Sequence, residues 1–369
     1  MSPLVKAPLG VAALLGWMSF AFGSSPAPRP ADDLEEPAAP VLLELKAELL
    51  YGGDELAMPT QIAVANARIA LVDGFAERPV HILDFKGRYV AGLGSNGEGP
   101  GEFEWPRAVE PSADGEGFWV FDNVLSRLTL VEPDRWDVIP ASARVTIPIR
   151  APAMVMGLVR RPGEGYVATG FFGEGRLARF DGEGTYEEAS GSIPESVIEA
   201  PAEVRQHAYR GTLKADPAGE RLVLANRHAG FLEVFTADGE PLRRITGPHE
   251  FEPPISIKAG ENGPSFASGD DLRFAYMDVA LTDDRIYALF SGRTRGGHPD
   301  AATYGRTVHV FDWHGELLEV LSLDADVMAI ALDEGWNRLL AVRHLPAPAL
   351  LWYPLPERGG PDANMRLAD

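Results

Sequence analysis

A unit of two short apolar strands recurs six times along the 369-residue chain, and this repeat limits the possible folds more than any other feature. In each copy an apolar run leads through a turn to a second apolar run, which usually ends in an aromatic residue followed by a polar residue and Gly. The first runs cover residues 68–73, 117–122, 165–170, 221–226, 285–290 and 338–342, and the second runs cover residues 80–87, 128–134, 177–182, 232–239, 308–315 and 350–354. The runs are rich in Val, Ile, Leu and aromatic residues, which suit a pleated sheet.

A further short strand precedes each pair. We place these innermost strands at residues 61–65, 107–111, 156–160, 210–214, 277–281 and 328–332. Turns of the D-x-x-G type supply the positive-φ glycine that a tight hairpin needs. The pattern predicts an all-β, six-bladed β-propeller with four-stranded blades over residues 41–356, with no room for a second domain.

The last unit ends one strand short, and residues 41–50 (VLLELKAELL) have no blade of their own. A propeller ring is closed when an N-terminal strand completes the last blade and removes an exposed edge. We therefore expect residues 41–50 to be the closing strand. The alternative is a short amphipathic helix, because the leucines of this segment also fit one helical face.

Two segments carry a resemblance to a known family. Residues 92–103 (GLGSNGEGPGEF) resemble the turn between blades of NHL-type and TolB-like six-bladed propellers, and residues 308–317 (VHVFDWHGEL) resemble a blade element of the same bacterial group. The resemblance extends over about residues 41–356. It implies the propeller architecture and an exported protein, and it implies no particular activity.

The N-terminus has the features of a secretory signal. Lys6 precedes an uncharged apolar stretch over residues 7–23, and Ala21-Phe22-Gly23 supplies the small residues of a cleavage site. We expect a signal peptide at residues 1–23, a disordered proline-rich linker at 24–40 and a C-terminal tail at 357–369. The alternative is an uncleaved membrane anchor, which is the sole membrane association we expect.

The composition excludes several classes of function. The formal net charge of −21 disfavours binding to nucleic acid, and the absence of cysteine rules out thiolate chemistry and Cys-ligated metals. Residues 92–97 match G-x-G-x-x-G, but the glycines and proline that follow prevent the helix that a dinucleotide site needs. We find no P-loop, catalytic elbow or calcium loop, and we expect no cofactor, no bound metal and a monomer.

Propellers bind ligands at the mouth of the central channel, which the innermost strands line. Among the polar side chains on those strands we single out Gln61, Arg107, Arg210 and Asp278, and Tyr209 and Tyr276 are adjacent. These six are our candidate ligand-binding residues. Arg107 and Arg210 either clamp an anionic group or neutralise Asp278 and nearby acidic residues.

The sequence thus favours an exported propeller that recognises a ligand or a protein without catalysis. The alternative is a lactonase-like propeller hydrolase with a divalent metal in the channel, for which Asp278 alone supplies too few oxygen ligands. A role in assembly at an outer-membrane complex rests on fold analogy. The insertions at residues 249–271 and 292–305 are either functional loops or tolerated surface additions.

Overall fold

The computed structural model describes residues 39–138, 144–163, 165–196, 199–255, 257–260, 263–266 and 269–356. Apart from Ala39, all of these belong to one compact unit, Pro40–Asp369. The signal peptide expected at residues 1–23 and the tail expected at 357–369 lie outside the described residues, as does all but the end of the expected linker.

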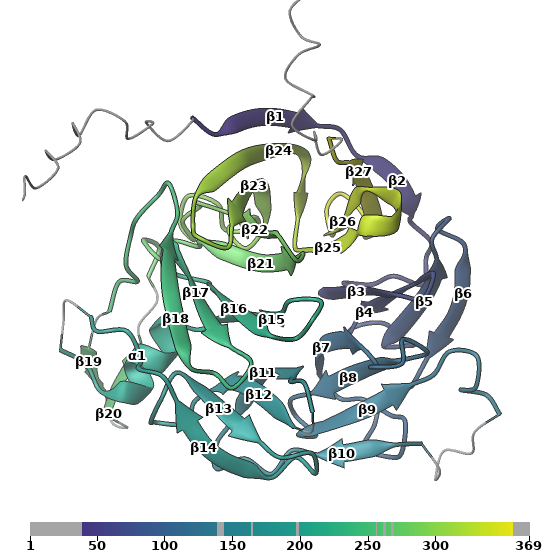
Figure 1. Cartoon of the computed structure of the whole chain (residues 1–369), viewed down its shortest axis with the longest axis horizontal. Helices are drawn as coiled ribbons and strands as arrows, with labels where there is room; N and C mark the ends of the chain where they lie inside the picture. The colour runs from purple at the N-terminus through teal and green to yellow at the C-terminus, as the bar shows by residue number, and fades with distance from the viewer. Residues whose placement is uncertain are drawn as a thin grey trace, which may run out of the picture. The chain divides into compact units, whose positions relative to one another are not determined.

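Six sheets are arranged as blades around a central axis, five of them four-stranded and one five-stranded (Figure 1). Blade one contains β3 (Gln61–Ala65), β4 (Arg68–Val72), β5 (Val80–Asp84) and β6 (Tyr89–Leu93). Blade two contains β7 (Pro106–Pro111), β8 (Phe118–Asp122), β9 (Arg127–Val131) and β10 (Thr146–Pro148). Blade three contains β11 (Val155–Arg160), β12 (Tyr166–Gly170), β13 (Leu177–Phe180) and β14 (Tyr186–Ser190).

The other three blades follow in chain order. Blade four contains β15 (Gly211–Ala215), β16 (Arg221–Asn226), β17 (Phe231–Thr236) and β18 (Pro241–Thr246). Blade five contains β21 (Tyr276–Leu281), β22 (Arg285–Phe290), β23 (Gly305–Asp312) and β24 (Leu317–Val327). Blade six contains β25 (Ala329–Asp333), β26 (Arg338–Arg343) and β27 (Ala349–Pro354), and is completed by β2 (Glu48–Tyr51). The innermost strands β3, β7, β11, β15, β21 and β25 contact one another in this order, and β25 contacts β3, so the predicted six-bladed ring is confirmed.

The N-terminal segment closes the ring, as expected, but it does so as two strands. β2 pairs antiparallel with β27 and completes blade six, whereas β1 (Val41–Leu45) pairs parallel with β24 and is a fifth strand of blade five (Figure 1). The Ala47 amide, between the two strands, donates a hydrogen bond to Asp324 Oδ1 at 3.0 Å. Leu43 and Leu45 are partly buried and Leu42 is exposed, which is the period-two pattern of a strand. The helical alternative for this segment is therefore wrong.

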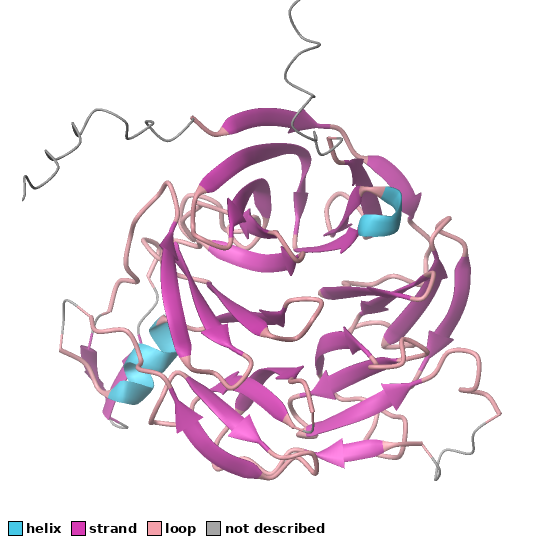
Figure 2. Cartoon of the chain, in the orientation of Figure 1, coloured by secondary structure: helices cyan, strands magenta, loops and turns pink. Residues whose placement is uncertain are grey.

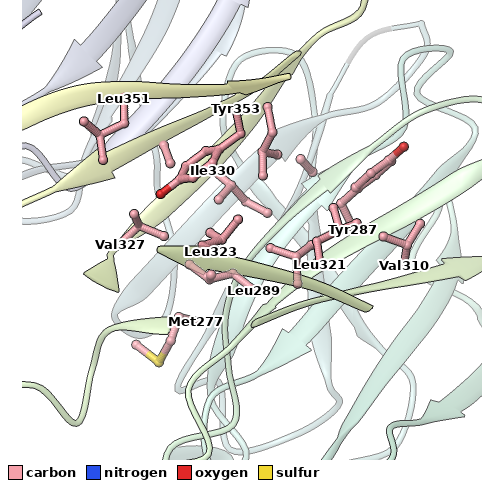
Figure 3. Close-up of a cluster of buried hydrophobic side chains, with 14 of the residues drawn as sticks. Met277, Tyr287, Leu289, Val310, Leu321, Leu323, Val327, Ile330, Leu351 and Tyr353 are labelled. Atoms are coloured by element: carbon pink, nitrogen blue, oxygen red, sulfur yellow. The ribbon is translucent and has the colours of Figure 1, made fainter. Parts of the chain in front are cut away.

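The core lies between neighbouring blades, which explains why several strands are apolar on both faces. Leu321, Leu323 and Val327 of β24 meet Ile330 of β25 and Tyr353 of β27 in one buried cluster (Figure 3). Corresponding clusters lie between the other blades. Burial of this apolar area at roughly 25 cal/mol per Å² is the main force that holds the blades together.

The turn between the third and fourth strands of a blade reaches the preceding blade. In blades one, three, four and five a glycine of this turn has positive φ and lies in contact with the preceding blade; these glycines are Gly87, Gly184, Gly239 and Gly315. A Cβ on Gly87 would lie 2.2 Å from the backbone oxygen of Leu50, and one on Gly184 would lie 2.2 Å from that of Pro148. Glycine is therefore needed here both for its conformation and for space.

Helices are short and few in the part of the chain that is described (Figure 2). α1 (Ala202–Ala208) lies between blades three and four, and the insertion after blade four contains the hairpin β19 (Ile257–Gly260) and β20 (Gly263–Phe266). No helix among the described residues has the length and apolar character to cross a membrane. The glycine-rich segment after β6 is a turn that buries Phe103, so the G-x-G-x-x-G match does not precede a helix.

Candidate ligand-binding mouth of the channel

The central channel has a cavity at each end. The innermost strands begin at a cavity of about 370 Å³ and end at a second cavity of about 580 Å³. Glu110 of β7 and Lys214 of β15 line both cavities. The two cavities are therefore opposite mouths of one channel, with these two side chains between them.

Three arginines line the smaller cavity, which we call the arginine mouth. Arg107 is the extra residue of a β-bulge in β7, since Pro106 and Ala108 pair with successive residues of β8. Such bulges redirect a side chain out of the regular alternation. Arg210 precedes β15 and Arg227 follows β16. The Arg227 amide donates a hydrogen bond to the Arg210 carbonyl oxygen at 2.9 Å, so this antiparallel pair brings both residues to the same mouth.

No carboxylate of the described residues lies within 4.0 Å of the guanidinium groups of Arg107, Arg210 or Arg227. Burial lowers the pKa of Arg107, and burial followed by the charges of Arg107 and Arg295 lowers the pKa of Arg210. The pKa of Arg227 is lowered to about 10 by burial and then by Arg210 and Arg107. The three cations are thus close enough to repel one another, and none of the described carboxylates forms an ion pair with them.

The histidines beside these arginines are uncharged and therefore neither add to the positive charge of the mouth nor neutralise it. Arg210 donates a hydrogen bond to His207 Nε2, and burial followed by the charge of Arg210 lowers the pKa of His207. Burial, with Arg210, lowers the pKa of His228 to about 3. Both imidazoles are therefore neutral at pH 7, which leaves the positive charge of the mouth on the arginines.

Polar groups continue from the mouth toward the middle of the channel. Lys214 Nζ donates a hydrogen bond to Gln61 Oε1 at 3.2 Å, and Glu110 Oε2 accepts one from the Arg160 amide at 3.1 Å. Glu110 is only partly exposed and lies deep in the molecule, so burial raises its pKa to about 7. The channel thus offers both donors and an acceptor behind the arginines.

Half of the predicted site residues lie at the arginine mouth. Gln61, Arg107 and Arg210 line it, and Tyr209, Tyr276 and Asp278 do not. The Tyr209 hydroxyl donates to Glu252 at 2.8 Å, and the Tyr276 hydroxyl bonds His309 Nδ1 at 3.0 Å. A bulge at Met277 leaves Asp278 in a paired position, where its Oδ2 accepts a hydrogen bond from the Ile330 amide at 2.9 Å. The side chain of Asp278 therefore joins two blades and does not face the mouth.

Sequence reasoning missed Arg227, Lys214 and Glu110. The signal for Arg227 was available, because the second strand of each blade runs back toward the mouth where the first begins. The arginine pair of the insertion at residues 292–305 separates: Arg293 bonds Asp326 at 2.7 Å, whereas the charge of Arg295 acts on Arg210.

The lactonase-like alternative requires oxygen or nitrogen ligands for a divalent metal. Within the residues that the structure describes, no three His, Asp or Glu side chains gather into a set that could hold an ion. Asp278, the ligand considered from the sequence, is engaged with Ile330.

Comparison with known proteins agrees with the architecture. A Bacteroides fragilis protein described as exported superposes with a TM-score of 0.56 and 7% sequence identity, over 85% of this chain and 99% of that one. The structure of U3-55K superposes with a TM-score of 0.50 and 14% identity, over 84% of this chain and 98% of that one. At these identities the likeness shows the fold alone. No protein of curated function matches the sequence. The model of the family described as TolB-like 6-blade propeller-like matches residues 45–335, and the chain therefore belongs to the TolB-like six-bladed propellers.

Proposed function

We propose that this protein is an exported binding protein that recognises a compact anionic ligand at the arginine mouth and carries out no chemistry on it. Arg107, Arg210 and Arg227 would hold the anion, and Gln61 would donate from the channel wall. Guanidinium groups recognise carboxylates and phosphates through paired hydrogen bonds, so the ligand class is a small carboxylate or phosphate with more than one negative charge.

The observation that carries this proposal is the convergence of three half-buried cations without an anionic partner. Partly burying like charges together costs free energy, and a protein with 54 Asp and Glu residues has ample carboxylates to neutralise them. None of those described is placed to do so. A bound anion would supply the missing charge, and a cavity of about 370 Å³ is within the range of small-molecule sites.

The sequence offered neutralisation of Asp278 as the other role for Arg107 and Arg210. Asp278 is held by the Ile330 amide, and the cation that counteracts the burial-raised pKa of Asp278 is Lys214. Neither arginine is among the groups that act on it. The geometry therefore favours an external anion as their partner.

Calorimetric titration with citrate, a compact tricarboxylate, tests the proposal. We expect binding at low ionic strength that weakens with added salt and falls at least tenfold in the Arg107→Gln, Arg210→Gln double variant. Arg88→Gln is the matched control, because Arg88 is an exposed surface residue paired with Asp84. The proposal is wrong if neither citrate nor inorganic phosphate binds, or if the double variant and the control bind equally well.

Export is the second part of the proposal. It is supported by the signal-like segment at residues 1–23 and by the description of the Bacteroides fragilis protein. Mass spectrometry of the protein from its native envelope fraction tests it: we expect a mature N-terminus near Ser24. An N-terminus at Met1 would instead establish a membrane anchor.

A further inference from the structure

The second cavity, at the opposite end of the channel, differs in chemistry from the arginine mouth. Its volume is about 580 Å³. Blades one, five and six contribute apolar side chains to its wall, among them Val64, Leu281 and Leu332, which are the last residues or close to the last residues of their inner strands and remain partly exposed. Blades two, three and four contribute most of the charged side chains, among them Glu110, Arg160 and Lys214, and blade six adds Glu334. The cavity thus has a mainly apolar wall on one half of the ring and most of its charged groups on the other.

The polar half carries two cations, Lys214 and Arg160, that form no ion pair within 4.0 Å in the described part of the chain, although the carboxyl of Glu110 lies near both. Lys214 makes its side-chain hydrogen bond with Gln61, and neither Lys214 nor Arg160 takes part in an ion pair there. The acidic neighbour Asp216 is held by Arg221 at 2.8 Å, and Arg161 is held by Asp238 at 2.7 Å. Lys214 and Arg160 are therefore the cationic groups that remain for a ligand at this end.

We propose that this cavity is a second binding site, which takes an aliphatic monocarboxylate. The alkyl chain lies against Val64, Leu281 and Leu332, and the carboxylate faces Lys214 and Arg160 beside Glu110. An apolar wall opposite a small number of convergent polar groups is the usual make-up of a ligand pocket, and the charge of the polar half selects an anion. This site shares Lys214 and Glu110 with the wall of the arginine mouth, but its apolar wall and its ligand class are different.

Glu110 gives the site a pH dependence. Burial raises the pKa of its carboxyl to about 7. The positive charges of Lys214 on β15 and Arg160 on β11, which face the carboxyl, oppose this increase. Below pH 7 the protonated carboxyl can donate a hydrogen bond to the ligand carboxylate. Above pH 7 its negative charge repels that carboxylate, so affinity falls as the pH rises.

Titration of the mature protein with octanoate, followed by calorimetry at pH 6 and pH 8, tests the proposal. We expect tighter binding at pH 6, weaker binding of butyrate than of octanoate, and a loss of about tenfold in affinity on Leu332→Ala, because apolar contact is removed. Lys214→Met should weaken binding by a similar or greater factor. Glu110→Gln should bind equally well at both pH values.

Arg107→Gln is the matched control and should leave octanoate binding unchanged while it weakens citrate binding; Leu332→Ala should show the opposite pattern. Val64→Ser is the second variant of the wall, should Leu332→Ala fail to fold. The proposal is overturned if octanoate does not bind, if the wall variants bind it as tightly as the parent, or if Arg107→Gln alone removes binding. A protein that binds octanoate but not citrate would disprove the arginine mouth and leave this site standing.

Discussion

Asp278 of β21 accepts a hydrogen bond from the amide of Ile330 in β25, with 2.9 Å between Oδ2 and N. The two residues belong to the innermost strands of blades five and six, which are not paired in one sheet. A side chain thus satisfies a backbone amide that no neighbouring strand reaches. The other carboxylate oxygen, Oδ1, is buried without a hydrogen-bond partner within the described structure.

This contact leads to a prediction about stability. Asp278→Ala should be about 1–3 kcal/mol less stable to unfolding than Asp278→Asn, because both variants lack the charge and only Asn keeps an acceptor for Ile330. Urea denaturation of the pair measures the difference. Citrate affinity should be the same in both; a loss of citrate binding at unchanged stability would place Asp278 in the recognition site.

The turn glycines provide a second test. Gly87→Ala should lower the free energy of unfolding by several kcal/mol, because the new Cβ would lie 2.2 Å from the Leu50 oxygen of the closing strand. Gly163 is the control, since its φ is +87° against +77° for Gly87 and, chain neighbours aside, no atom of the described residues lies within 4 Å of an added Cβ. Gly163→Ala should cost about 1 kcal/mol, the strain of the left-handed conformation alone. Equal losses would show that the contact with Leu50 is unimportant.

Arg227 should show a conflict between stability and binding. Its pKa of about 10 lies below that of a free arginine, so the folded state disfavours the charged form and the charge reduces stability at pH 7. Arg227→Met keeps the apolar stem and removes the charge. We expect the free energy of unfolding without ligand to rise by about 1–3 kcal/mol and citrate affinity to fall at least tenfold. Thermal melts with and without citrate measure both effects. A variant that is less stable and binds normally would contradict this role.

Glu110 should shape the pH dependence of stability. Its folded pKa of about 7 is above the ordinary value of 4.5, so the folded state holds the proton more tightly. The stability that this proton confers is complete below pH 4.5 and is lost as the pH rises to about 7. The difference in unfolding free energy between Glu110→Gln and the parent should therefore shift in favour of the variant by about 1–3 kcal/mol between pH 5 and pH 8. A difference that is constant with pH would show that Glu110 titrates normally.

The closing strands can be tested with single substitutions. Leu43 packs partly buried against the core between blades five and six, whereas Leu42 on the same strand is 76% exposed. Leu43→Ser should lower the midpoint of thermal unfolding by about two degrees, through a loss of about 1 kcal/mol. Leu42→Ser should leave it nearly unchanged. The reverse order would mean that β1 packs with its other face inward.

The blades could be predicted from the sequence because, apart from the closing strands β1 and β2, each is built from neighbouring segments whose apolar runs and turn glycines mark the strands directly. Position 277 shows where this reading fails: a bulge there changes which residue faces the channel, and no residue type marks a bulge. Tyr209 and Arg210 are adjacent in the sequence, yet the Tyr209 hydroxyl bonds Glu252 whereas Arg210 lines the arginine mouth. This difference depends on the packing of the folded chain. Likewise, the leucines of residues 41–50 predicted a strand but did not identify its partner, β24. The paired residues Val41 and Glu319 are 278 positions apart in the sequence.

The pairing of β1 with β24 also determines at what point of synthesis the ring can close. Blades one to four consist of segments that follow one another, so each can form soon after it is made. β1 and β2 are made first, yet their partners β24 and β27 are among the last parts of the chain to emerge. A chain interrupted before β24 therefore carries two early strands with open edges, which are the sites that aggregation and proteolysis exploit. Because β1 and β2 close the ring, the propeller can be completed only after the chain has been synthesised through its last blade.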